Sequence, residues 1–336
     1  MATLRRLLCG ALAALSMLGF AGGADAQAVN LKLGHILPAD SPDHRAFVFM
    51  GDRIKALTNG EVTLQIFPAS QLGAVNVMME GLQAGSLDMM VELLEFWGNA
   101  DKRFGVFGVP YLFRDRAHFV NYLKSPGFKK MADELGASRN LVFFGDATEW
   151  QFRSDRTLLS KKPIFSPADL AGVKLRMFQA RVPVLTWQTL GTNTVIIPWG
   201  EVYTALATGT IEAVTARVEA HYATKQTEVA KYMTVTEEYY QTYLPVMSKR
   251  TYDRLKPEHR AAVVKAASEA GAEFMRLSAE ATETYQARVK SEHGVSIIYP
   301  PLGPWKAAVQ PIQGKFEEEG IIPKGMLAEI AAIKSN

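Results

Sequence analysis

The chain almost lacks cysteine. Its only cysteine among 336 residues is Cys9, which lies in a segment with the three parts of a secretory signal peptide. These parts are the basic pair Arg5-Arg6, an apolar run from residue 7 to about residue 22, and the small-residue end Ala24-Asp25-Ala26. We therefore predict that residues 1–26 direct export and are removed. The rest of the chain has no thiol, which excludes disulfides, thiolate metal ligands and cysteine nucleophiles and suits the oxidising periplasm.

The chain also lacks a strong charge of either sign. Its 37 lysines and arginines nearly balance 34 aspartates and glutamates, which gives a net charge of +3 at pH 7. The predicted signal peptide carries two arginines and one aspartate, a net +1 of that total, so +2 remains on the rest. This balance does not indicate nucleic-acid binding, and no second apolar run approaches the ~18 residues of a membrane-spanning helix. We expect a periplasmic protein without a nucleic-acid partner.

Common catalytic and metal-binding motifs are missing as well. The sequence contains no HExxH, GxSxG, P-loop or GxGxxG motif, which argues against zinc proteases, serine hydrolases and nucleotide-binding enzymes. The histidines never occur at the three-to-five-residue spacing of a zinc pair. These histidines are His35, His44, His118, His221, His259 and His293. We expect no metal, no cofactor and no enzymatic activity.

What the sequence does contain is an alternation of apolar runs and helical stretches, which is typical of an α/β protein with mostly parallel sheets. In the first part we predict strands at 29–36, 61–67 and 87–91, with helices at 43–57 and 75–84. Ligands of such sheets bind at the carboxyl ends of the strands. A chain of this length usually forms two lobes, each large enough for its own core.

A second series of strands and helices follows and ends in one long helix. The residues from 257 to 293 contain no proline after the first position and only one glycine. A helix of that length would measure roughly 50 Å, longer than one lobe is wide, so we expect it to tie two lobes together. The other predicted elements are strands at 141–144, 151–159, 172–180, 194–197 and 210–215, a capped turn at 166–169, and helices at 181–190, 200–207 and 218–230.

The strand at 172–180 places two cations and an aromatic side chain on one face. Lys174, Arg176 and Phe178 alternate with an apolar face made of Val173, Leu175 and Met177. By pattern alone, charges on a strand usually face solvent and mark an exposed edge. Phe178 indicates instead that this face is covered at one end, so a cleft-facing arrangement of Arg176 stays open.

Four stretches together resemble the periplasmic solute-binding proteins of TRAP transporters over nearly the whole exported chain. They are FPASQLG at 67–73, LQAGSLDM at 82–89, PADLAGVKLRM at 167–177 and PWGEVYTALATGTIEAV at 198–214. The resemblance implies a two-lobe flytrap that captures a small organic acid. We expect a monomer, although the sequence does not determine the oligomeric state. The resemblance also implies a membrane permease, made of a small and a large subunit and driven by an ion gradient, as the partner that receives the acid. We assign lobe I to 27–153 plus about 242–281, and lobe II to 154–241 plus about 282–336.

The resemblance also implies site residues in lobe II. Arg176 stands where the family has the arginine that forms a bidentate salt bridge with the ligand carboxylate, a geometry that lysine cannot provide. Arg156 stands where the family has a second arginine, with Arg153 a less favoured candidate and a surface position the alternative. Trp199 is expected as an aromatic wall of the pocket, with plain core packing as the alternative, and Phe178 lies on the cleft-facing side.

In lobe I the residues that follow predicted strands are the candidates for the facing wall. They are Glu92, Glu95 and Trp97 after the strand at 87–91, and His35 at the end of the first strand. Many relatives then have an asparagine that bonds the ligand carboxylate where this chain has Ala216, followed by Arg217. Whether Arg217 replaces that contact stays open, and the loss favours a less polar monocarboxylate, such as an aromatic or 2-oxo acid.

Two other functions fit the same residues. One is a periplasmic sensor that presents its ligand to a membrane receptor. The other is an isomerase or lyase acting on a carboxylic acid, with Glu92 or Glu95 as base and Arg176 as substrate anchor. Detectable turnover would identify the enzyme, and neighbouring genes for two membrane subunits would identify the transporter. The sequence leaves the acid, its affinity and the coupling ion undetermined.

Overall fold

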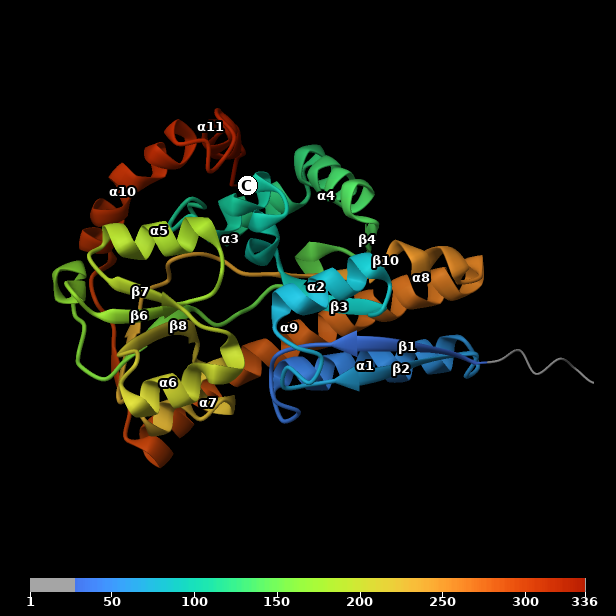
Figure 1. Ribbon diagram of the computed structural model, residues 1–336, viewed down its shortest axis with the longest axis horizontal. Coiled ribbons are helices and arrows are strands. Elements are labelled where there is room, and N and C mark those ends of the chain that lie inside the picture. The colour runs from blue at the N-terminus through green and yellow to red at the C-terminus, as the bar shows by residue number, and fades with distance from the viewer. Residues whose placement is uncertain (1–27, 336) are drawn as a thin grey trace, which may run out of the picture.

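The computed structural model describes residues 28–335 and shows an α/β protein with two lobes (Figure 1). The predicted signal peptide lies outside the described residues. Lobe I contains a five-stranded sheet with the strand order β2-β1-β3-β10-β4, and lobe II a six-stranded sheet with the order β11-β9-β5-β8-β6-β7. The strands of lobe I are β1 (Val29–Gly34), β2 (Val62–Phe67), β3 (Met89–Leu93), β4 (Leu141–Phe143) and β10 (Tyr243–Ser248). Those of lobe II are β5 (Arg156–Ser160), β6 (Lys174–Met177), β7 (Asn193–Ile196), β8 (Ala213–Arg217), β9 (Tyr232–Val235) and β11 (Ser296–Ile298).

Both sheets are mixed. Five of the nine strand pairings are parallel, and the antiparallel ones all involve β10 in lobe I or β5 in lobe II. Both strands lie close to the points where the chain passes between the lobes. Crossing the lobes therefore places one reversed strand inside each otherwise parallel sheet.

Local signals account for most helix boundaries. Helix α1 (Pro42–Leu57) begins after Ser41, whose hydroxyl accepts a hydrogen bond from the His44 N–H, with Pro42 in the first turn. Helix α2 (Val75–Ala84) ends at Gly85 in the left-handed conformation, as glycine allows. The predicted turn at 166–169 is confirmed as a short 3₁₀ helix, η4 (Pro167–Leu170), with a complete capping box.

The remaining helices pack against the sheets or against one another. They are α3 (Arg116–Leu123), α4 (Pro126–Arg139), α5 (Arg181–Thr189), α6 (Val202–Thr208), α7 (Val218–Ala223), α8 (Lys249–Arg254), α9 (Pro257–His293), α10 (Leu302–Glu318) and α11 (Met326–Ala331), with 3₁₀ segments that include η1 (Leu94–Asn99), η2 (Lys102–Gly108) and η6 (Gln226–Glu228). The single helix expected at 218–230 is interrupted, because Lys225 adopts a left-handed conformation between α7 and η6. None of the described helices has the length and apolarity needed to cross a membrane.

Helix α9 has the predicted boundaries and spans both lobes (Figure 1). Its first half, from Val263 to Leu277, belongs to a core cluster of lobe I, and Val289 near its end belongs to a core cluster of lobe II. A side chain at Gly271 would collide with the lobe I backbone, because a Cβ atom there would lie 2.7 Å from the Glu149 carbonyl oxygen. The close approach anchors the middle of the helix to lobe I.

The C-terminal segment differs from the predicted extent of lobe II. Trp305 in α10 packs in a core cluster of lobe II, but Phe316 and Ile330 belong to a cluster built mainly from lobe I side chains. The His118 ring bonds the Ile330 carbonyl oxygen at 2.8 Å. Residues after about 305 therefore return to lobe I, because their apolar face finds its partners there.

Candidate functional site

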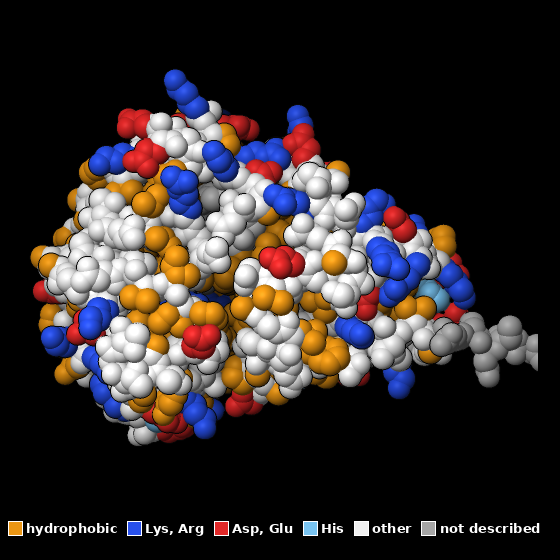
Figure 2. Space-filling model, viewed as in Figure 1, with side chains coloured by type: hydrophobic (Ala, Val, Ile, Leu, Met, Phe, Trp, Pro, Cys, Tyr) orange, Lys and Arg blue, Asp and Glu red, His pale blue; other side chains and the backbone are white. Residues whose placement is uncertain are grey.

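A cavity lies between the lobes, enclosed by both of them. Figure 2 shows apolar side chains gathered along the boundary where the lobes meet. Space for the centres of water-sized groups inside the cavity amounts to about 70 Å³, enough for several such groups at once. The walls are formed by His35, Ile36, Leu37, Phe47, Val91, Glu92, Leu93, Glu95, Phe96, Arg156, Arg176, Phe178, Trp199, Thr215, Ala216, Arg217, Ala220, Gln241 and Tyr243.

Strand ends position most of these side chains. Four parallel strands, β1, β3, β6 and β8, end at the cavity and present His35, Glu92, Arg176 and Arg217 there. Arg156 begins β5, and because β5 runs antiparallel to β8 with Arg156 opposite Arg217, it lies at the same edge. The cavity therefore occupies the carboxyl edge of both sheets, where α/β proteins bind ligands.

Arg176 is buried and lacks an acidic partner. Only 5% of its surface is exposed, whereas Lys174 on the same strand is exposed, so the solvent-edge interpretation holds for Lys174 alone. Its Nε–H donates to the Ile197 carbonyl oxygen at 2.8 Å, and its guanidinium lies 5.2 Å from the ring centroid of Trp199. In the described chain no carboxylate lies within 4.0 Å of it. Burial and the charge of Arg156 lower the pKa of Arg176 to about 9, so the group keeps its charge at pH 7.

Arg156, by contrast, is neutralised within its own lobe. Its Nε–H donates to the Glu238 carboxylate at 2.5 Å, and an Nη donates to the Thr215 hydroxyl. The Arg156 guanidinium carbon lies 4.5 Å from the ring centroid of Tyr239. Burial alone would lower the pKa of Arg156, but Tyr239 and the Glu238 carboxylate raise it above its ordinary value. One edge of Arg156 still lines the cavity.

Arg217 is held between two carboxylates. Its guanidinium lies 3.6 Å from Asp43 of lobe I and 3.6 Å from Glu219 of lobe II, and it covers the face of the Phe152 ring. The carboxylates are fixed in turn, since Tyr243 donates to Asp43 at 2.6 Å and the Ser154 hydroxyl donates to Glu219. The Nη1 of Arg217 is buried without a partner in the described chain. Its neighbour Ala216 also lines the cavity.

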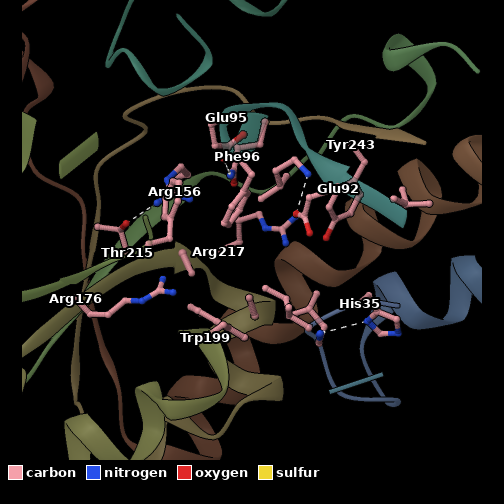
Figure 3. A pocket seen from close by; sticks show the side chains of 18 of the residues that line it. His35, Glu92, Glu95, Phe96, Arg156, Arg176, Trp199, Thr215, Arg217 and Tyr243 are labelled. Atoms are coloured by element: carbon pink, nitrogen blue, oxygen red, sulfur yellow. Dashed lines mark hydrogen bonds between the residues drawn. The ribbon is translucent and has the colours of Figure 1, made fainter. Parts of the chain in front are cut away.

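Two buried carboxyl groups of lobe I face these arginines (Figure 3). Burial raises the pKa of Glu92 to about 8, so this group is mainly protonated at pH 7; an oxygen of Glu92 accepts the Leu93 N–H at 2.9 Å. Burial also raises the pKa of Glu95, although Arg156 opposes the shift, and Glu95 accepts a hydrogen bond from Gln241.

His35 forms the neutral corner of the cavity. Burial and the neighbouring His44 lower the pKa of His35 to about 3. Its Nδ1 accepts the Leu37 N–H at 3.3 Å, which leaves the proton on Nε2 to bond His44 Nδ1 at 3.0 Å. Both ring nitrogens are therefore engaged within lobe I.

The aromatic residues divide between wall and core. Phe178 and Trp199 line the cavity, and Phe178 packs against Phe96 with ring centroids 4.5 Å apart. The structure places Trp97 elsewhere: it is fully buried in the lobe I core, edge-on to Phe143. The short helix η1 turns Glu95 and Phe96 toward the cavity, and this turn sends Trp97 away from it.

Several wall residues carry no signal in the sequence that would single them out. Gln241 lies just before β10 and Tyr243 is its first residue, and the sequence pattern predicts no strand there. Thr215 was within a predicted strand but carried no charge or aromatic ring to single it out. Buried fully on both faces, β10 lacks polar alternation, so its proximity to the site follows only from pairing with β3. Within residues 28–335 no cluster of side chains suits a metal ion.

Comparisons with known proteins agree with this architecture. The chain matches the family model for bacterial extracellular solute-binding protein, family 7, over residues 33–319. It is 31% identical over 271 residues to the 2,3-diketo-L-gulonate-binding periplasmic protein YiaO of Escherichia coli, covering 81% of each chain.

Two solved structures of TRAP periplasmic solute-binding proteins have the same fold. One, from Xanthobacter autotrophicus with bound β-D-galacturonate, is 28% identical, covers 90% of this chain and all of its own, and has a TM-score of 0.81. The other, from Ochrobacterium anthropi with bound L-fuconate, is 26% identical, covers 92% of this chain and all of its own, and has a TM-score of 0.84. With its two lobes and the cavity between them, this chain belongs to the family 7 extracellular solute-binding proteins, the solute receptors of TRAP transporters.

Proposed function

We propose that the protein captures a small organic acid in the interlobe cavity, with the ligand carboxylate bound by Arg176. The observation that carries the proposal is the buried Arg176 guanidinium, which has no acidic partner of its own. A charge removed from water without a counterion is costly, so the cavity favours an anion at this position. The two terminal nitrogens of Arg176 match the two oxygens of a carboxylate.

Arg156 supplies a second cationic group next to Arg176. Its pairing with Glu238 already satisfies most of its charge, so we assign it a supporting contact with the acid group or with a neighbouring hydroxyl. Trp199 and Phe178 complete the wall around the bound carboxylate. This arrangement is supported by the ligands named for the structural relatives, since galacturonate and fuconate are both carboxylates.

The lobes would close on the acid and present it to a permease of a small and a large membrane subunit. A ligand that touches both lobes stabilises the closed form by the difference in its affinity for the two states. Moving a population from 1:99 to 99:1 needs about 5.5 kcal/mol of that difference. We further propose that the protein is exported to the periplasm and acts as a monomer.

A thermal-shift screen of the protein against small organic acids tests this function. Ligand at about 100 times its Kd adds about 2.7 kcal/mol of stability, so a bound acid should raise Tm by several degrees. Product analysis of the same mixtures should show no turnover. If no acid raises Tm, or if a bound acid is converted, the proposed function is wrong.

A further inference from the structure

A second cavity, which we call the vestibule, adjoins the interlobe cavity at Arg176. The two cavities share five wall residues, which are Ile36, Phe96, Arg176, Phe178 and Trp199. Space for the centres of water-sized groups amounts to about 400 Å³ in the vestibule, against about 70 Å³ in the interlobe cavity. Because Arg176 belongs to both walls, an acid bound there can extend into the larger space.

Both lobes contribute walls to the vestibule. Lobe I provides one side of helix α2, including Met79 and Gln83, and lobe II provides the end of β7 and the residues after it, as far as Trp199. The lobes touch at this wall, because the side-chain amide of Asn99 donates to the Gln179 carbonyl oxygen at 2.5 Å. A group inside the vestibule would therefore contact both lobes, as the proposed closure requires of a ligand.

The vestibule surface near Arg176 is largely apolar. In addition to the three shared aromatic rings, its wall contains Val75, Met79, Ile196, Ile197 and Pro198. Ile196, at the end of β7, is 55% exposed. An apolar group in the vestibule would leave water together with these side chains, and such burial is favourable.

Several polar side chains of the vestibule already have partners in the protein. Gln83 Nε2 donates to the Met79 carbonyl oxygen at 3.3 Å, and an Nη of Arg139 donates to the Ala100 carbonyl oxygen at 3.2 Å. The Asn99 amide is engaged by the bond between the lobes. A hydroxylated chain would find these three donors occupied, whereas an alkyl chain needs no hydrogen-bond partner.

We propose that the vestibule is an outer subsite for the apolar tail of a monocarboxylate whose carboxylate is bound by Arg176. The proposal rests on the proposed function of Arg176. It agrees with the sequence-based hypothesis of a less polar acid, and it extends that hypothesis by placing the tail outside the interlobe cavity, between α2 and β7.

Calorimetric titration of the intact protein with straight-chain acids tests the subsite. The series is acetate, butyrate, hexanoate and octanoate, which share one carboxylate and differ in chain length alone. Each buried methylene should tighten binding about fourfold, so octanoate, with half of its four additional methylenes buried, should bind about 15-fold more tightly than butyrate. Equal binding of butyrate and octanoate overturns the proposal, because the vestibule would then contribute nothing.

The same titrations separate this proposal from the proposed function. If the series does not bind but another acid from the thermal-shift screen does, the subsite is wrong and the function stands. If no acid binds, the function itself fails. Octanoate should not bind to Arg176→Met, and octanoate binding that survives this substitution would place the chain on another surface and overturn the proposal.

Two substitutions in the vestibule assign the effect to named residues. Met79→Gln should weaken octanoate binding about tenfold and Ile196→Thr about threefold, since each replaces apolar wall by a polar group, while butyrate binding should change less than about twofold. Val264→Thr alters an exposed β-branched residue of α9 and should change neither. If the two vestibule variants weaken butyrate and octanoate equally, they act on the packing of the lobes and the proposal fails. Tm of each unliganded variant verifies folding.

Discussion

The two lobes contribute different ionisable groups to one cavity. Lobe II provides all three guanidinium groups of the wall, on β5, β6 and β8, whereas lobe I provides the acidic groups of η1 and β3 and, behind them, Asp43. Arg156 and Arg217, the two wall guanidinium groups with carboxylate partners, are paired in different ways. Arg156 is paired within lobe II, but Arg217 shares its charge between Glu219 of lobe II and Asp43 of lobe I.

This difference suggests separate roles for the two lobes in binding an acid. Lobe II carries the cationic groups of the wall, and under the proposed function a bound anion would compensate Arg176, the one guanidinium of the described wall without a carboxylate. In the proposed closure, lobe I would cover the ligand, and the contact between Asp43 and Arg217 lies across the boundary that closes. The proposed closure would therefore join acidic and basic surfaces, and the ligand would supply the negative charge that Arg176 lacks.

The largest effect is expected from removing the unpaired guanidinium. Arg176→Met should weaken binding of the acid found in the screen at least about 1,000-fold, because it deletes a bidentate charge-assisted pair. The unliganded variant should be as stable as wild type or more so, because a buried charge without a counterion is removed. Calorimetric titration and thermal unfolding measure the two results. Lys174→Met on the exposed part of the same strand is the matched control, and retained ligand stabilisation in the Arg176 variant would refute the assignment.

Removing the paired guanidinium of Arg156 should lower the free energy of unfolding. Arg156→Met leaves Glu238 buried without its counterion, and breaking a buried pair costs about 3–5 kcal/mol. Urea unfolding should show this loss in the absence of ligand, whereas Arg153→Met, which alters an exposed arginine three residues earlier, should change stability little. Equal stability of the two variants would show that Arg156 does not differ from a surface arginine.

Glu92 should make the stability of the protein depend on pH. Burial holds its pKa at about 8 in the folded protein against 4.5 as the reference, so between these values the folded state binds the extra proton. Its stabilising contribution is present below about pH 4.5 and is lost as pH rises toward 8, by at most about 1.4 kcal/mol per pH unit. The charged groups around it are Glu95, Arg217 and Asp43, with Tyr243 also near.

Substitution isolates this effect. Glu92→Gln cannot ionise, so its free energy of unfolding relative to wild type should increase between pH 5 and pH 8. Denaturant titrations at several pH values measure the difference. Parallel pH profiles for the two proteins would show that Glu92 is already ionised in the folded state.

The contact across the boundary should have a smaller effect. Asp43→Asn removes the lobe I carboxylate that lies beside Arg217. The closed form then loses the ion pair between the lobes, so acid binding should weaken about tenfold. Small-angle scattering at a subsaturating concentration of the acid should show a larger radius of gyration for the variant than for wild type at the same concentration. Asp52→Asn, at an exposed position of the same helix, should change neither quantity, and an unchanged Asp43→Asn variant would refute the role of this contact in closure.

The smallest effect concerns the aromatic wall. Trp199→Phe keeps a ring near Arg176 but with a weaker π face, so binding should weaken by only about threefold, in line with cation–π energies of about 0.5–1 kcal/mol. Calorimetry with the same acid measures the change. A loss as large as that of Arg176→Met would mean that Trp199 determines the shape of the cavity.

Local sequence signals were sufficient for elements whose boundaries depend on nearby residues. The ends of α9, the capping box of η4 and the left-handed end of α2 follow from proline, serine, aspartate and glycine at defined positions. The cleft-facing side of β6 could also be proposed, since Phe178 marked it. Such signals work because helix caps and turns are satisfied within a few residues.

The sequence by itself predicted that Arg156 and Arg176 lie in strands, that Arg217 follows a strand, and that a long helix joins two lobes. Only the tertiary structure decided which arginine stays unpaired, that Trp97 enters the core, and that Gln241 reaches the cavity. The partners of these side chains are remote in sequence: Glu238 lies 82 residues after Arg156, and Gln241 lies 146 residues after Glu95. Charge compensation depends on distance in space, so it is fixed only when the sheets pair and the lobes meet.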